Sequence, residues 1–318
     1  MAIQRKLPGT DETRNRALSG AKTKKDNTAP ANIAITPATI TRLDAMQPLF
    51  NGLMQSRANA QQAQSNSTDA KDLAQARAHM FVSHFIQAFN NGVDRGMFPA
   101  SHRAFYQLDV NSNSVPDINT EPLLTQWGQR LIDGDAARIA AGGAPMAMPT
   151  IAEVTFEYNA FKNANIAQSA AKDALDQAQE NVEDQREEAD KIILKIWDEV
   201  ETFFNEETIT SKRRKAREWG LVYISTVKSI IRVKARHAVT AAALPGVSAR
   251  IVETDESAVT DANGDLQLKT GFVGITDIEF GKPTFITETK QLDIPEGSDL
   301  TQDVNLQPLL PAPPQPAP

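Results

Sequence analysis

The sequence predicts an α+β multidomain protein, with an elongated N-terminal helical bundle followed by a small C-terminal antiparallel β domain. A chain of 318 residues is long enough for two domains that each bury a core. Apolar residues recur at three- and four-residue steps through residues 34–243, as in amphipathic helices. After Leu244-Pro245-Gly246 they give way to short alternating segments with frequent Gly and Pro. We therefore predict a helical domain over residues 34–243 and a β domain over residues 244–309.

The first part of the helical domain shows several start and stop signals. Asn91-Gly92 and Gly142-Gly143 are typical helix ends, and Thr120 is a typical helix start. Pro48 should kink or split the helix that contains it, because proline has no amide hydrogen to donate. The helices expected from these signals cover residues 39–65, 67–92, 101–106 and 120–143.

The clearest helical pattern is a heptad seam in the second half of this domain. Its members follow one another in steps of four and three, with one polar residue among them: Leu175, Ala178, Val182, Gln185, Ala189, Ile192, Ile196, Val200 and Phe203. Such a seam needs a packing partner along its whole side. The spacing leaves open whether that partner belongs to the same chain or to a second copy.

Charge is distributed unevenly around this seam. Residues 173–207 contain thirteen acidic and three basic residues, whereas residues 212–236 contain nine basic residues and one acidic residue. Trp219, Val222, Tyr223, Val227, Ile230 and Val233 predict that the basic segment belongs to a helix over residues 211–241. Because one exposed ion pair contributes only about 0–1 kcal/mol, we expect the opposite charges to select the partner and its orientation.

Both ends of the chain differ in composition from the domains. Residues 1–33 are polar, lack periodicity and hold seven basic against three acidic residues, so they predict a basic arm that is disordered in isolation. Residues 310–318 form a Pro-rich tail that should be extended. Such arms commonly become ordered only when a neighbouring subunit holds them.

Several kinds of chemistry are disfavoured. The chain has no cysteine, which excludes disulfides and thiolate sites, and none of its four histidines lies three residues after a glutamate, as carboxylate metal bundles require. No nucleophile elbow, phosphate-binding loop or dinucleotide fingerprint is present. We therefore predict a protein that is not an enzyme, with no catalytic, cofactor-binding or metal-binding residues, and for which a small-molecule substrate is not expected.

The stretch TDANGD, residues 260–265, could bind calcium or form a turn. Counted from Asp261, the sixth residue of a calcium loop should be Gly and the twelfth Glu, but these positions hold Leu266 and Phe272. Asn263-Gly264 is instead a strong hairpin signal, because both residues tolerate positive φ. We expect a hairpin turn, with loose ion binding by Asp261 and Asp265 as the alternative.

The β domain resembles the transthyretin-like carboxypeptidase regulatory domain. The matching positions are Gly246-Val247 at the first strand, Thr260–Gly264 before Leu266 and Leu268, Gly281 after Ile278 and Phe280, and Gly297 before Val304 and Leu306. The resemblance implies an Ig-like β-sandwich with an accessory role in a bacterial protein, and it carries over no active site. Pro283, in the stretch FGKPTF, departs from the common pattern. The helical domain resembles no family.

One cluster is a candidate interaction site. The run SKRRKAREWG holds Lys212, Arg213, Arg214, Lys215 and Arg217, and clustered basic residues can neutralise phosphates. The favoured interpretation is that they pack against the acidic segment before them, either within the chain or between subunits. Nucleic-acid attachment through this helix is the alternative.

These features together predict a structural or assembly protein that forms a higher-order homo-oligomer through its helical domain and terminal arms. The alternative is a binding or adhesion module whose β domain engages a carbohydrate or a protein. No secretory signal or membrane-spanning stretch is apparent, so a cytoplasmic location is expected by default. An extracellular location would need a non-standard route or a particle.

Overall fold

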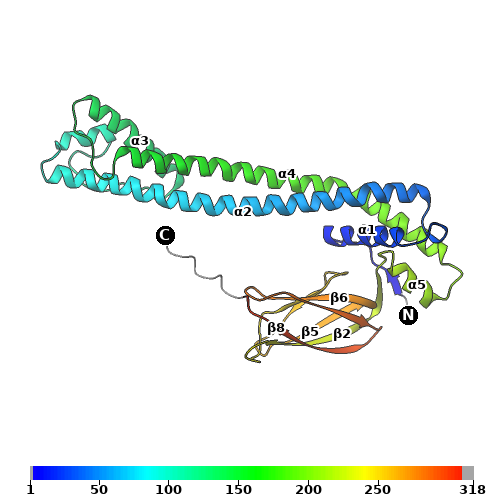
Figure 1. Ribbon diagram of the computed structural model, residues 1–318. Coiled ribbons are helices and arrows are strands. Elements are labelled where there is room, and N and C mark those ends of the chain that lie inside the picture. Colours follow the sequence, from blue (N-terminus) through cyan, green and yellow to red (C-terminus); the bar gives the residue numbers. More distant parts are fainter. Residues whose placement is uncertain (1–2, 310–318) are drawn as a thin grey trace. The chain divides into compact units, whose positions relative to one another are not determined.

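The computed structural model describes residues 3–309 (Figure 1). A helical N-terminal region precedes β-sheets at the C-terminus, which confirms the α+β class. The chain forms two compact units: the first contains the residues up to Met54 and those from Val182 onward, and the second spans Gln55–Asn181. The helices α2 (Pro37–Asp94) and α4 (Ile151–Phe203) contribute to both units.

The N-terminal arm is ordered against its own chain. It forms the strand β1 (Ile3–Arg5) and the helix α1 (Asp11–Asp26), which begins at a capping box made by Thr10 and Thr13. Leu18 and Ala21 are fully buried in the core of the first unit. The expectation of a disordered arm is therefore wrong, because its few apolar residues reach a core formed by distant parts of the chain. The tail predicted over residues 310–318 lies outside the described residues.

Helix α2 is a single helix in which the break predicted after residue 65 does not occur. Pro48 lies inside the helix without splitting it. The side chains of Ser67 and Thr68 donate hydrogen bonds of 3.0 Å to the carbonyl of Gln64. These polar residues therefore bond within the helix instead of capping a new one, which is an alternative that Ser and Thr side chains always have.

The second unit has a core at the end formed by the short helices. The 3₁₀ helix η2 (Ala100–Tyr106) and the helix α3 (Glu121–Ala140) lie close to the expected positions. They pack with residues from α2 and α4, and the cluster includes Val82, Phe85, Phe89, Tyr106, Leu124, Trp127, Leu131, Val154 and Phe161. The fully buried guanidinium of Arg138 is paired with Asp135 at 2.8 Å, and the Tyr106 hydroxyl also donates to Asp135 at 2.6 Å.

Much of the heptad seam on α4 is buried in the core of the first unit, within the chain. Val182, Ala189, Ile192, Ile196 and Val200 pack with residues of α1 and with the first part of α2. Gln185 is half-buried and Phe203, the last member, is 49% exposed. Over this part of its length, the partner of the seam is therefore intramolecular.

The helix predicted over residues 211–241 is wrong. A short helix, α5 (Ile209–Arg217), ends near Gly220, whose φ of +83° favours glycine, and the long strand β2 (Tyr223–His237) follows. The residues of β2 alternate between the two faces of a sheet, with Ile231, Val233 and Ala235 buried and the basic residues between them exposed. The β region therefore begins before the boundary predicted at Leu244.

The strands form two four-stranded sheets. The strands after β2 are β3 (Ser248–Ile251), β4 (Ser257–Val259), β5 (Asp265–Phe272), β6 (Gly274–Gly281), β7 (Glu288–Ile294) and β8 (Asp299–Leu306). In one sheet, β2 pairs with β1 and β5 antiparallel and with β8 parallel. The other sheet is antiparallel with the order β4-β3-β6-β7. One apolar cluster draws residues from both sheets.

The turn at TDANGD connects these two sheets. It joins β4 of one sheet to β5 of the other, so the expected hairpin between paired strands is wrong. Asp261 Oδ1 accepts hydrogen bonds from the amides of Asn263 at 2.8 Å and Asp265 at 3.0 Å. Gly264 has a φ of +75°, and its carbonyl accepts a hydrogen bond from the amide of Ala235 at 2.7 Å. Asp261 thus stabilises a turn that passes close to β2.

Candidate functional site

The five basic residues predicted as an interaction site lie on α5 but do not share one role. Lys215 forms an ion pair with Glu207, while Arg213 and Arg217 lie over the ring of Tyr223 at 5.8 and 5.7 Å. Arg214 is exposed and Lys212 is partly exposed. Arg217 also lines a cavity inside the first unit. The structure therefore divides this cluster between the surface and the interior.

The acidic segment pairs mainly with the N-terminal arm and with α2. On α4, Asp198 is 2.7 Å from Arg5, and Asp190 is 2.8 Å from Arg14. Glu188, also on α4, is 2.7 Å from Arg42.

Two basic side chains of β2 have acidic partners in the β region instead: Arg232 is 3.0 Å from Asp299, and Lys228 is 3.8 Å from Glu256. Within the chain, the expected charge pairing between segments 173–207 and 212–236 is therefore wrong, apart from the pair of Lys215 with Glu207. The physical reason is that residues 223–237 form a strand within a sheet, which cannot pack along α4 as a helix would.

The helix pair of the second unit has a long stretch without a core. No side chain of α2 is buried over residues 55–77, and none of α4 is buried over residues 162–177. Both segments consist mainly of Ala, Gln, Asn, Ser and charged residues. Most helical stability in proteins comes from packing an apolar face, and in this stretch the least exposed positions of both helices are only half-buried.

Large apolar side chains lie exposed on the same helices. Leu73 on α2 and Ile166 on α4 are each 67% exposed, and both belong to the stretch without a core. Met80 and Phe156 are exposed nearby in sequence, Phe156 at 71%. Leu73 and Met80 are seven residues apart, which places them on one face of α2. Leu73 and Met80 therefore expose two large apolar groups on the same side of this helix.

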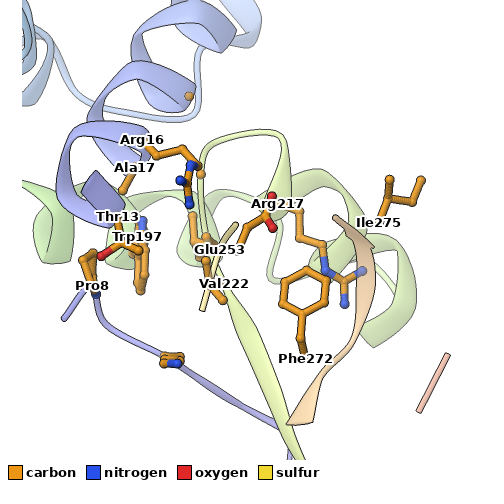
Figure 2. Close-up of a pocket in the computed structure, with 14 residues that line it drawn as sticks. Pro8, Thr13, Arg16, Ala17, Trp197, Arg217, Val222, Glu253, Phe272 and Ile275 are labelled. Atoms are coloured by element: carbon orange, nitrogen blue, oxygen red, sulfur yellow. The ribbon is translucent and has the colours of Figure 1, made fainter. Parts of the chain in front are cut away.

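A cavity of about 200 Å³ lies in the first unit, between the helices and the sheets (Figure 2). Residues from α1, α4, α5, β5 and β6 line it, together with residues of the adjoining loops. Its apolar wall includes Pro8, Ala17, Trp197, Leu221, Val222, Phe272 and Ile275. The polar groups that line it include Lys6, Arg16, Arg217 and Glu253. Figure 2 shows Arg16 extending from α1 toward Glu253, with Arg217 near Phe272.

The three cations of the cavity lack carboxylate partners. No Asp or Glu oxygen in the described residues lies within 4 Å of Lys6, Arg16 or Arg217. Lys6 Nζ instead donates to the carbonyl of Thr254 at 2.9 Å, and Arg16 donates to the carbonyl of Val252. The buried Nε of Arg217 has no hydrogen-bond partner within the described part of the chain. Burial lowers the pKa of both arginines from the usual value.

Other basic residues of the same arm are paired. Arg5, Arg14, Lys22, Lys24 and Lys25 each lie within 4 Å of a carboxylate. In the described part of the arm, the basic side chains without a carboxylate within 4 Å are therefore the two that line the cavity, Lys6 and Arg16.

Among the described residues that line this cavity, Glu253 is the only one with a carboxylate. Burial raises its pKa to about 7, and the nearby carboxylate of Asp277 acts in the same direction. The Thr276 hydroxyl donates a hydrogen bond to Glu253. Near neutral pH a large fraction of Glu253 is therefore protonated, which leaves the positive charge of the cavity only partly balanced.

Sequence patterns did not indicate this group of residues. Lys6 and Arg16 belong to the arm that was expected to be disordered, and Glu253 follows β3 in a segment without a motif. The signal that could have found Arg217 was its membership of the basic run, but the run gives no information on which of its members turns inward.

The described residues offer neither a metal site nor a membrane-spanning helix. From residue 3 to residue 309, no group of three or more His, Asp or Glu side chains is arranged to hold a metal ion. Within the same range, no helix is both long enough and apolar enough to cross a bilayer.

Comparison of the sequence with protein-family models and with curated proteins gives no match. The chain's own geometry therefore has to support any functional proposal.

Proposed function

We propose that this protein is a non-enzymatic structural protein that self-associates into a higher-order homo-oligomer, a filament or a lattice, through its helical domain. The observation that carries the proposal is the stretch of α2 and α4 that buries no side chain while exposing Leu73 and Ile166. A second copy packed on this stretch would supply the missing apolar contacts. Because the N-terminal arm packs on its own chain, the proposal is confined to the helical domain.

Charge favours a second copy as the occupant of this surface. Residues 55–77 contain three basic and two acidic residues, and residues 162–177 contain two of each. This near neutrality contrasts with the strongly acidic segment that follows on α4. Two copies of the stretch would therefore meet without strong repulsion, whereas an acidic or a basic partner would gain little from it.

We also propose that the β region is a transthyretin-like β-sandwich with an accessory role. The support is that one apolar cluster contains residues of both sheets, such as Ile231 and Val304 from one and Ile278 and Ile294 from the other. Two sheets that share one core in this way are typical of β-sandwiches. Phe272 and Phe280 belong to this cluster, so they are not free to bind a carbohydrate on the surface.

Nucleic-acid attachment through α5 has less support. Of the five basic residues, Lys215 is paired with an acidic residue and Arg217 lines the cavity. Only part of the cluster therefore remains to contact phosphates.

Sedimentation velocity of the full chain over a wide concentration range tests the proposal of self-association. We expect oligomers that grow with concentration, and we expect Leu73→Gln combined with Ile166→Gln to shift the midpoint of association at least about tenfold upward. The matched control is Val239→Gln, which removes a side chain that is 79% exposed in the first unit.

Two results would count against self-association through this surface. One is a wild-type chain that stays monomeric at every concentration. The other is a control variant that weakens association as much as the double variant does.

A further inference from the structure

The cavity of the first unit combines three features that belong together in a ligand site. It is lined by three cationic side chains without carboxylate partners among the described residues, it has a broad apolar wall, and one of its guanidinium nitrogens is buried without an acceptor. A buried donor without a partner is destabilising by about 1–3 kcal/mol in proteins generally. A protein that keeps such a donor in a cavity has a ready partner for an anionic ligand.

We propose that this cavity binds a small organic carboxylate, with the anionic head paired to Arg217 and Arg16 and an apolar body against Trp197 and Phe272. This inference does not depend on self-association, because the cavity and the exposed stretch of α2 and α4 belong to different units.

Size and shape indicate the class of ligand. An apolar cavity of about 150 Å³ holds one benzene molecule, so a cavity of about 200 Å³ has room for a ring of that size with a carboxylate. A guanidinium presents parallel N–H donors that match the two oxygens of a carboxylate. A multiply charged anion would be disfavoured, because Glu253 shares the same space.

Arg217 is held in place from the side of the sheet. A Cβ built on Gly274 would lie 2.8 Å from Cζ and 2.9 Å from Nε of Arg217, so the guanidinium lies directly against the backbone of this glycine. Gly274 has a φ of +123°, a conformation that other residues rarely adopt. Because Gly274 has no side chain, the guanidinium of Arg217 packs directly on its backbone. This contact limits how far the Arg217 side chain would have to move when a ligand binds.

Calorimetry on the full chain at pH 6 tests the proposal with three probes. Benzoate carries both the ring and the charge, benzyl alcohol carries the ring alone, and acetate carries the charge alone. We expect benzoate to bind and the other two to bind at least about tenfold more weakly, since a charge-assisted hydrogen bond and the burial of a ring each contribute that much. Equal binding of all three probes, or no binding of benzoate, would overturn the proposal.

Matched arginine variants locate the binding. Arg217→Gln should weaken benzoate binding at least about tenfold, whereas Arg213→Gln should leave it unchanged. Arg213 is on the same helix and also lies over Tyr223, but it does not line the cavity. If both variants lose the same amount of affinity for benzoate, benzoate responds only to the surface charge of α5, and the proposed site is rejected.

A second variant decides the matter if Arg217→Gln does not fold. The charges of Arg16 from α1 and Asp277 from β6 act on Glu253, and Lys6 from the arm and Arg217 from α5 line the same cavity. As the pH rises from 6 to 8, Glu253 gains its negative charge and repels the bound carboxylate, so wild-type affinity for benzoate should fall several-fold. Glu253→Gln should abolish most of this fall. If benzoate affinity has the same pH dependence in both proteins, benzoate does not bind beside Glu253 and the proposal fails.

Discussion

Replacing Glu253 with glutamine should stabilise the protein above pH 7. The folded state raises the pKa of this carboxyl from 4.5 to about 7, chiefly because burial disfavours the charged form. Between these two values the folded chain binds more protons than the unfolded chain, so stability falls as the pH rises through this window. Each pKa unit corresponds to about 1.4 kcal/mol, and after allowance for solvent screening the loss is about 2 kcal/mol.

A glutamine side chain at this position has no proton to lose and can still accept the hydrogen bond from Thr276. The free energy of unfolding of Glu253→Gln relative to wild type should therefore rise by about 2 kcal/mol between pH 4.5 and 7.5. Urea unfolding followed by tryptophan fluorescence measures this, since the buried Trp197 lines the same cavity. Glu206→Gln, at an exposed carboxylate, is the control. A difference between variant and wild type that stays constant over this pH range would refute the reasoning.

Two further substitutions test the interior of each unit. Asp135→Asn should lower the free energy of unfolding of the second unit by about 3–5 kcal/mol, because it leaves the fully buried Arg138 without a countercharge. Urea unfolding measures this change in free energy, with Asp133→Asn, at an exposed position, as the control. If both variants lower the free energy of unfolding equally, the pair of Asp135 and Arg138 does not stabilise the unit as a buried pair. Gly264→Ala should destabilise the first unit by about 2 kcal/mol or more, since its φ is +75° and a Cβ would lie 2.4 Å from the carbonyl oxygen of Ala235. In thermal unfolding, Gly281→Ala should have a much smaller effect, as the nearest atoms to its Cβ are 3.7 Å away.

The parts of the fold that the sequence predicts well are those in which one local pattern decides the outcome. The seam on α4 has an unbroken spacing, and Val182, Ile192 and Val200 are buried as that spacing requires. The end of α3 was predictable in the same way, from Gly142-Gly143 in the sequence. Gly142 follows the C-cap residue of the helix and has a φ of +88°, which glycine adopts readily. In such places no distant contact competes with the local preference.

Strand β2 shows why other parts were not predictable. Its buried positions alternate from the start, but two of them hold Ser225 and Ser229, while the apolar Val227 and Ile230 are only partly buried. The apolar residues therefore have a spacing that fits a helix, although the chain is a strand. The serines are tolerated inside because Ser225 donates to Glu296 and Ser229 donates to the carbonyl of Pro295 at 2.8 Å. Those partners lie more than sixty residues away and leave no local signal.

The candidate cavity depends on long-range contacts to an even greater degree. Its cations come from the arm and from α5, and its carboxylate comes from the turn that follows β3. No spacing rule links these segments. The basic run pointed to Arg217 without showing that it turns inward. The count of basic residues in the arm did not distinguish Arg14, which pairs with Asp190 of α4, from Arg16, which lines the cavity.

The N-terminal arm explains how the helices and the sheet of the first unit are joined. Strand β1 extends the sheet by pairing with β2, while α1 buries Leu18 against the seam of α4. The crossing is close because two glycines meet there: a Cβ on Gly20 would lie 3.4 Å from the Cα of Gly220. Within this unit, the arm thus bonds to the sheet on one side and to the helices on the other. The cavity lies where these contacts leave a gap, so a ligand held by Arg16 and Arg217 would contact elements of both kinds and stabilise their junction.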